Sequence, residues 1–230
     1  MRKRGLKNAL RIAIVGAAMF SASQLSAASL LTSSAGYTGP TLDLSAFDAF
    51  YVFTQGPIAL PGGITYSSTS AGSVIGKGGY GLADNGGSEN ALIVGTNSGS
   101  DVVTFTFDTA VATFGGGMNY ALSGSGPFGN NPVIAAYDSF DALIASYDLL
   151  TLAPINTPGG LDAFEFRGIN GDGTLIKSFT ISGSFAIIQG NLGNAVPEPA
   201  TWAMMLLGFG FVGGAMRAAK RRQNLSVSLA

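Results

Sequence analysis

The chain of 230 residues contains no cysteine and no histidine, and its formal net charge is -1. The missing residue types exclude Ser-His-Asp and Cys-His nucleophilic sites, zinc fingers, thiolate clusters and disulfide frameworks. The length allows one ordinary domain with terminal extensions. An enzyme built from this chain would have to use carboxylates.

The charge is divided unevenly along the chain. Residues 1–28 carry five basic side chains, residues 29–196 carry 12 acidic and 3 basic ones, and residues 197–230 carry four basic and one acidic. The net charges of the three parts are +5, -9 and +3, which add to -1. A middle region with a charge of -9 repels phosphate backbones, so we expect no binding to nucleic acid.

The first 28 residues have the layout of a secretory signal peptide with a helical apolar segment. Basic residues precede an apolar run over residues 12–20, which is too short to span a hydrocarbon core of roughly 30 Å. Ser26 and Ala28 satisfy the preference for small side chains before the cut, whereas cleavage after Ala27 would put the bulky Leu25 at a constrained position. We predict cleavage by signal peptidase after Ala28.

Residues 29–195 are predicted to form one secreted, acidic β-domain. Val103, Phe105 and Phe107 alternate with polar side chains, as a strand with one buried face requires. The same alternation places Leu175 on one face with Phe179, Ile181, Phe185 and Ile187, and Lys177 interrupts it. The pattern predicts strands over both segments.

Two hairpins are expected in this domain. Residues 133–137 and 143–147 are apolar segments joined by a short polar connection. Residues 170–174 read Asn-Gly-Asp-Gly-Thr, which supplies the positive φ values of a tight hairpin turn. Many short strands with glycine-rich turns favour an all-β fold, an antiparallel β-sandwich or a jelly roll, flanked by the N-terminal signal helix and a C-terminal transmembrane helix.

Residues 62–99 contain 11 glycines and only scattered apolar positions, which predicts long surface loops. Tyr66 and Tyr80 lie in this segment, and an exposed aromatic face beside polar groups can stack on a sugar ring. We therefore consider them a candidate ligand-binding loop. The alternative is that they are ordinary exposed tyrosines of a secreted β-protein.

Acidic residues could supply a metal site or a hydrolase, and neither is the favoured interpretation. Residues 170–173 match part of an EF-hand loop, but Gly168 and Phe179 stand where carboxylates are needed. No cofactor is expected, and a structural calcium ion at a loop junction stays open as an alternative. Glu165 is expected at a solvent-facing strand position with Arg167 as its partner on the same face. We expect no enzymatic activity.

The C-terminal part combines three elements in a fixed order. The sequence Pro197-Glu198-Pro199 is followed by Trp202 and Ala203, and an apolar run then extends to residue 216. A helix over residues 200–216 would be about 25 Å long, marginal for a membrane span. The basic residues behind the run predict a membrane stop that stays in the cytoplasm; they are Arg217, Lys220, Arg221 and Arg222.

This order of elements resembles the PEP-CTERM sorting signal in its PEPxxWA variety, over residues 196–222, with residues 223–230 as a tail beyond it. The resemblance implies that a membrane-embedded exosortase is a partner and removes the segment, after transient residence in the inner membrane of a Gram-negative bacterium. It also implies an association with exopolysaccharide and biofilm. The same element is sometimes labelled as the C-terminal domain of ice-binding proteins, which describes a tail and not an activity.

A second resemblance concerns the middle of the chain. Residues 103–108, 133–138, 166–169 and 176–183 are similar to segments of lectin-like or carbohydrate-binding β-sandwiches. We predict a sorted protein of the cell surface or extracellular matrix whose β-domain is structural or binds polysaccharide. The alternatives are a carboxylate-dependent hydrolase of surface glycans, and a protein permanently anchored by an uncut C-terminal helix.

Overall fold

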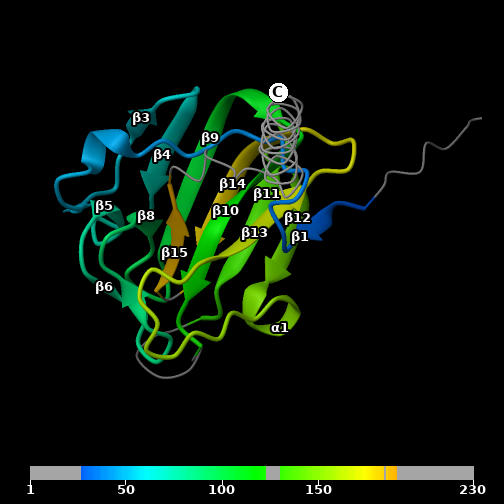
Figure 1. Ribbon diagram of the computed structural model, residues 1–230. Helices are drawn as coiled ribbons and strands as arrows, with labels where there is room; N and C mark the ends of the chain where they lie inside the picture. The colour runs from blue at the N-terminus through cyan, green and yellow to red at the C-terminus, as the bar shows by residue number, and fades with distance from the viewer. Residues whose placement is uncertain (1–26, 123–129, 184, 191–230) are drawn as a thin grey trace, which may run out of the picture.

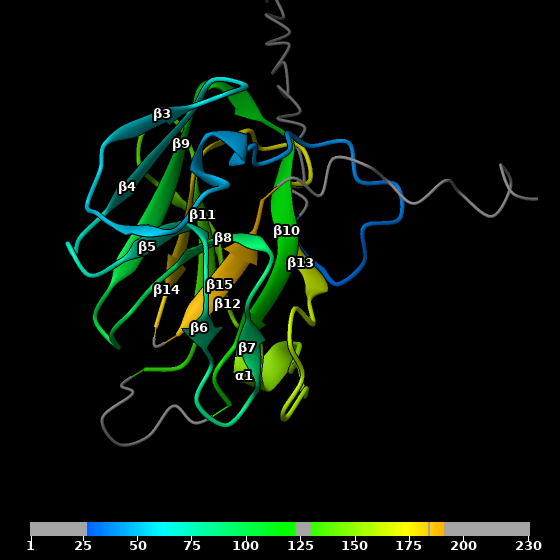
Figure 2. The same ribbon diagram turned by 60° about the vertical axis from the view of Figure 1, so that its left-hand side comes forward.

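The computed structural model describes residues 27–122, 130–183 and 185–190. These residues form two antiparallel β-sheets that pack face to face, together with a short two-stranded ribbon (Figures 1 and 2). Helix within these ranges is limited to the single turns η1 (Ser45–Phe47) and α1 (Leu149–Leu152). The predicted all-β sandwich is therefore confirmed.

The first sheet has seven strands in the order β1-β13-β10-β15-β8-β5-β2. Their bounds are β1 (Ser29–Leu31), β13 (Glu165–Asn170), β10 (Thr113–Tyr120), β15 (Ala186–Gln189), β8 (Leu92–Gly95), β5 (Val74–Lys77) and β2 (Val52–Phe53). The second sheet has six strands in the order β12-β11-β14-β9-β4-β3. Their bounds are β12 (Leu143–Asp148), β11 (Val133–Tyr137), β14 (Ile176–Ser182), β9 (Val102–Val111), β4 (Ile64–Ser68) and β3 (Ile58–Leu60). The ribbon consists of β6 (Tyr80–Gly81) and β7 (Gly87–Ser88).

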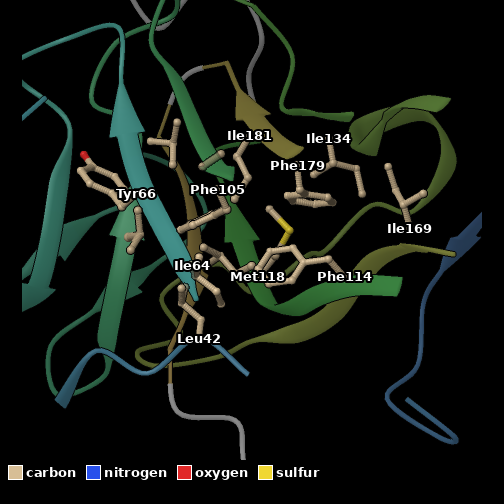
Figure 3. Packing of buried hydrophobic residues seen from close by; sticks show 14 of the residues in the cluster. Leu42, Ile64, Tyr66, Phe105, Phe114, Met118, Ile134, Ile169, Phe179 and Ile181 are labelled. Carbon is tan, nitrogen blue, oxygen red and sulfur yellow. The ribbon is translucent and has the colours of Figure 1, made fainter. Parts of the chain in front are cut away.

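The main core lies between the two sheets (Figure 3). Val103, Phe105 and Phe107 of β9 are buried, and Thr104 and Thr106 are not, which confirms the predicted alternation. The ring of Phe114 on the opposite sheet lies 5.5 Å from that of Phe105, 4.8 Å from that of Phe107 and 5.0 Å from that of Phe179. These aromatic contacts join the sheets at their centre.

A second, smaller core covers the outer face of the seven-stranded sheet. Val74, Ile93 and Ile187 point away from the main core because their strand neighbours Ile75, Val94 and Ile188 point into it. Tyr80, Leu82 and Ala91, from the ribbon and its flanking segments, pack on them. The strands β5, β8 and β15 are consequently buried on both faces.

The predicted hairpins have different outcomes. Strands β11 and β12 pair antiparallel from Val133↔Asp148 to Tyr137↔Leu143, so that hairpin is confirmed. The segment after β13 does form a tight turn, with positive φ at Asp172 (45°) and Gly173 (102°). However, β13 and β14 belong to different sheets, so the predicted hairpin is wrong. The turn signal is local, whereas the choice of pairing partner depends on which sheet each strand joins.

The alternation predicted around Leu175 is also corrected. Leu175 is exposed and Ile176 is buried, because the pairing of β14 with β9 shifts register between Ile176 and Ser178. A bulge of this kind reverses which parity points inward. At the irregularity the Lys177 Nζ donates to the backbone oxygens of Phe107 (2.6 Å) and Asp108 (3.1 Å), so the cation has backbone partners.

The prediction of long surface loops over residues 62–99 is wrong. This segment contributes β4, β5 and β8 to the two sheets and forms the β6–β7 ribbon. Its glycines are used where the backbone packs closely or turns. A Cβ at Gly76, where φ is +122°, would lie 2.6 Å from the carbonyl oxygen of Phe50.

Candidate functional site

The last described residues, which precede the C-terminal segment, lie at the middle of the seven-stranded sheet. Strand β15 lies between β10 and β8, and the Gly190 N–H donates to the backbone oxygen of Leu92 at 2.8 Å (Figure 2). A Cβ at Gly190 would lie only 2.5 Å from the Leu44 Cγ, so Gly190 packs closely against the segment that carries Leu44. Whatever follows Gly190 is therefore attached to a central, buried strand.

The predicted signal cleavage site lies at the start of the first strand. Ser29 begins β1 and pairs with Asn170 of β13. The Tyr147 hydroxyl donates to the backbone oxygen of Ala28. Burial, and secondarily the negative charge of Asp172, raise the pKa of Tyr147 above its ordinary value. Ser26 lies outside the described residues, and cleavage after Ala28 stays a prediction.

Tyr66 and Tyr80 do not present ring faces to a ligand. Both are buried: Tyr66 lies in the main core and Tyr80 in the smaller one. The Tyr66 hydroxyl donates to the backbone oxygen of Thr54 at 2.8 Å, and the Tyr80 hydroxyl donates to that of Thr96. Burial raises the pKa of Tyr66 to about 12, and it raises the pKa of Tyr80 further still. The expectation of exposed tyrosines on a binding loop is therefore wrong.

A buried amide that the sequence analysis did not single out holds three segments together. Asn85 is fully buried, and its Nδ2 lies 2.8 Å from the Tyr120 carbonyl oxygen and 2.9 Å from that of Ile155. Its Oδ1 accepts from the Thr157 N–H at 2.6 Å. The neighbouring Asn119 Nδ2 donates to the backbone oxygen of Ala163 at 2.8 Å. No local pattern in the sequence connects residues so far apart.

The carboxylates of the domain are used mainly to fix loops. Asp162 accepts from the Ser88 hydroxyl (2.9 Å) and from the backbone N–H groups of Glu89, Asn90 and Ala91 (3.0 to 3.3 Å). Partial burial alone would raise the pKa of Asp162, but these hydrogen bonds outweigh it and hold the pKa below its ordinary value. Asp101 is buried and accepts from the Ser98 hydroxyl at 2.6 Å.

Glu165 and Arg167 form the predicted pair on one face of β13. The Arg167 Nη2 lies 2.7 Å from the Glu165 Oε2, and its Nε donates to the backbone oxygen of Ala153 at 3.0 Å. The Arg167 side chain is buried rather than solvent-facing, because residues 153–155 cover this part of the sheet. In the part of the chain that the structure describes, no group of three or more acidic side chains is arranged to hold a metal ion.

The comparison with protein families identifies the segment that leaves β15. The PEP-CTERM protein-sorting motif family matches residues 195–222. The chain carries a PEP-CTERM sorting signal. The search of curated proteins and the search of solved structures each found no match. The resemblance of the β-sandwich to lectin-like domains stays a prediction.

The PEP-CTERM signal implies processing by exosortase, a membrane protease, and export through the membrane to the cell surface. Its predicted residues lie outside the described ranges: Pro197, Glu198, Pro199, Trp202 and Ala203 in the motif, and Arg217, Lys220, Arg221 and Arg222 in the membrane stop. The predicted signal and transmembrane helices also lie outside them. Within residues 27–122, 130–183 and 185–190, no helix is long and apolar enough to cross a membrane.

Proposed function

We propose that the mature β-sandwich is a non-catalytic component of the cell surface or extracellular matrix of a Gram-negative bacterium, with a structural or polysaccharide-binding role. The PEP-CTERM signal supplies the route of export. The observation that supports a non-catalytic role is the use of the carboxylates. The alternative, a carboxylate-dependent glycan hydrolase, depends on free, apposed carboxyl groups.

Three of the carboxylates are already committed to the fold. Asp162 is held by four donors from residues 88–91, and Asp101 by the Ser98 hydroxyl and the Asn97 N–H. The carboxylate of Glu165 faces the Arg167 guanidinium. Each of these groups would have to break a hydrogen bond or an ion pair before it could accept a proton from a substrate.

Sorting is tested by the intact mass of the protein from culture medium and from cell envelope, in hosts with and without exosortase. We expect the host without exosortase to accumulate the longer form in its inner membrane. Equal secretion of one product by both hosts would contradict exosortase sorting. The mass of the product also reports both cut sites, and a working product that retains residues 200–230 would indicate permanent anchoring.

The role of Pro197 and Pro199 in keeping the segment before the membrane helix extended is tested by replacing both with alanine. Alanine allows the predicted membrane helix to extend toward the N-terminus. Because a protease binds its substrate in an extended conformation, we expect the variant to be processed more slowly. A matched control is the double substitution Pro154→Ala and Pro158→Ala, which removes two prolines from the domain and leaves the signal intact. Equal processing rates in the two double variants would refute this role of the prolines.

The role of the domain is tested with exopolysaccharide isolated from the producing bacterium. We expect the mature protein to co-sediment with the polysaccharide, or to be required for the mechanical cohesion of the matrix, and to release no reducing sugar ends. Release of reducing ends that disappears in the Glu89→Gln or Glu165→Gln variant would overturn the non-catalytic proposal. It would favour a glycan hydrolase instead.

A further inference from the structure

The end of the sandwich from which the chain leaves toward the PEP-CTERM signal can be defined from strand pairing. We call it the exit end. Ile188 pairs with Met118, so β15 runs toward the start of β10, where Thr113 pairs with Asn170. In the other sheet, Ile176 pairs with Val111 at the same end, and the Gly171 N–H donates to the Ala112 oxygen there. The turns over residues 138–142 and 171–175 therefore lie at the exit end (Figure 1).

Exposed apolar side chains gather at the exit end. In the described ranges, seven large hydrophobic side chains are exposed, and four of them lie there. These four, which we call the apolar tips, are Phe50 (64% exposed), Phe140 (88%), Leu143 (58%) and Leu175 (54%). Leu152, which follows the far end of β12, and Leu161, which bridges Gly87, lie at the opposite end. The seventh, Phe53 (59%), pairs with Val74 and lies three residues further from the exit end than Phe50.

The position of each tip follows from its strand. Tyr137 pairs with both Ser178 and Leu143, which puts the turn carrying Phe140 beside the start of β14. Leu175 directly precedes β14. The backbone of Phe50 lies against Gly76, which precedes Lys77. Lys77 pairs with Leu92 of β8. The backbone oxygen of Leu92 accepts the hydrogen bond from the Gly190 N–H. Phe50 and Gly190 thus lie in one row of the seven-stranded sheet, which is the end of β5 and β8 and meets β10 near Gly116, three residues from Thr113.

The tips are spread widely rather than joined in one groove. Phe140 and Leu143 belong to the β12 edge, which lies over β1 because the Tyr147 hydroxyl bonds to Ala28. Phe50 precedes β2, the opposite edge of the seven-stranded sheet, six strand spacings or about 29 Å from β1. Separated apolar points at one end fit a broad surface better than they fit a peptide or a single sugar chain.

The sorting signal holds the exit end close to a broad surface, the membrane. Only nine residues, 191–199, separate Gly190 from the predicted membrane helix at residue 200. Nine residues span at most about 30 Å even when fully extended. While the helix is in the bilayer, the exit end is therefore held close to the membrane. A short tether of this kind raises the effective concentration of even a weak contact.

We propose that the apolar tips dock on the surface of the bilayer that holds the PEP-CTERM signal, and that the domain sits on its exit end until exosortase releases it. Phenylalanine and leucine side chains partition into the boundary between headgroups and acyl chains. The inference depends on the sorting signal and is independent of what the mature domain binds.

The charges at the exit end favour zwitterionic lipids. Asp138 and Asp141 flank Phe140, and Asp172 lies in the turn before Leu175. The lysines near this end are engaged, since Lys77 pairs with Asp48 at 3.3 Å and Lys177 bonds to backbone oxygens. Carboxylates repel an anionic surface but attract the ammonium groups of phosphatidylcholine and phosphatidylethanolamine.

The experiment uses the full chain after removal of the signal peptide, purified from a host without exosortase and inserted by its own tail into phosphatidylcholine vesicles. The chain has no cysteine, so single-cysteine variants can carry an environment-sensitive fluorophore without further changes. Phe140→Cys and Leu175→Cys probe the tips, with Phe50→Cys as a third probe on the other edge. Leu161→Cys is the matched control, since its side chain is 56% exposed against 54% for Leu175.

We expect lipids that carry a quencher near the headgroup to quench the fluorophores at positions 140, 175 and 50 several-fold more than the one at position 161. Their emission should also shift to the blue. Equal quenching at all four positions would overturn the proposal. Fluorophores that are shielded from an aqueous quencher but untouched by the lipid quencher would also overturn it, since they would indicate a protein partner or a second copy. Circular dichroism checks that each variant is folded.

Discussion

The two sheets of the sandwich differ in how many of their faces are covered. The six-stranded sheet buries one face, and on β9 and β14 the other face carries partly exposed threonine and serine residues. The middle of the seven-stranded sheet is covered on both faces, by the main core on one side and by the ribbon and residues 157–163 on the other. The open face of the six-stranded sheet tolerates polar substitutions. On the seven-stranded sheet, each polar group that is buried under the covering layers needs a hydrogen-bond partner.

The largest expected loss of stability concerns the main core, which lies between the two sheets. Phe114→Ala should lower the free energy of unfolding by about 4 kcal/mol, because it leaves a cavity among three aromatic rings. Urea denaturation of the mature protein measures the loss. A loss below about 1 kcal/mol would indicate that the sheets repack around the cavity.

The covered outer face of the seven-stranded sheet is probed at Asn85. Asn85→Ala should cost about 3 kcal/mol, because the Thr157 N–H and the carbonyl oxygens of Tyr120 and Ile155 lose a buried partner. The matched substitution on the open sheet is Thr104→Ala, which should cost less than about 1 kcal/mol. Similar losses in the two variants would remove the distinction between the sheets.

The loop that covers this face should also respond to acid. The pKa of Asp162 is lower in the folded protein than its ordinary value of 3.8, so its hydrogen bonds stabilise the fold above that pH. This contribution is lost as the pH falls below 3.8 through the folded-state pKa. Asp162→Asn should cost about 1–2 kcal/mol at neutral pH. The difference between the variant and the wild type should shrink in urea titrations toward pH 3.

The smallest effect is expected at the pair of Glu165 and Arg167 on β13. Glu165→Gln removes the charge that faces Arg167, but the guanidinium keeps its bonds to the backbone oxygens of Ala153 and Phe166. Because the Glu165 side chain is largely exposed, the loss should be less than about 1 kcal/mol. A loss as large as that of Asn85→Ala would show that the pair is a principal support of this part of the fold.

Strands with one buried face are easier to predict from the sequence than strands that are buried on both faces. The alternation along β9 was readable because one face meets water and the other meets the core. On β10 almost every residue is buried, and Gly115, Gly116 and Gly117 interrupt any apolar pattern. Within residues 62–99, β5 and β8 are hard to recognise for a related reason, since short strands that are buried on both faces have no polar side to mark them.

The local signal at residues 170–174 identified a turn but not the partners of the strands that it joins. Asp172 and Gly173 have the positive φ values that the sequence implied, yet the strands that they join lie in different sheets. The candidate sugar-binding residues failed similarly. Tyr66 and Tyr80 stand in a glycine-rich segment, but each lies in a strand whose pairing buries its ring in one of the two cores.

The amino-acid sequence by itself determined the class of fold, the absence of histidine and cysteine chemistry, and the C-terminal sorting signal, because each depends on residue types at short spacing. Only the tertiary structure decided which strands pair, which tyrosines are buried, and that the signal leaves from a central strand beside a set of exposed apolar tips. Pairing joins residues far apart in the chain, and it is selected by the burial of whole faces, which no local segment encodes.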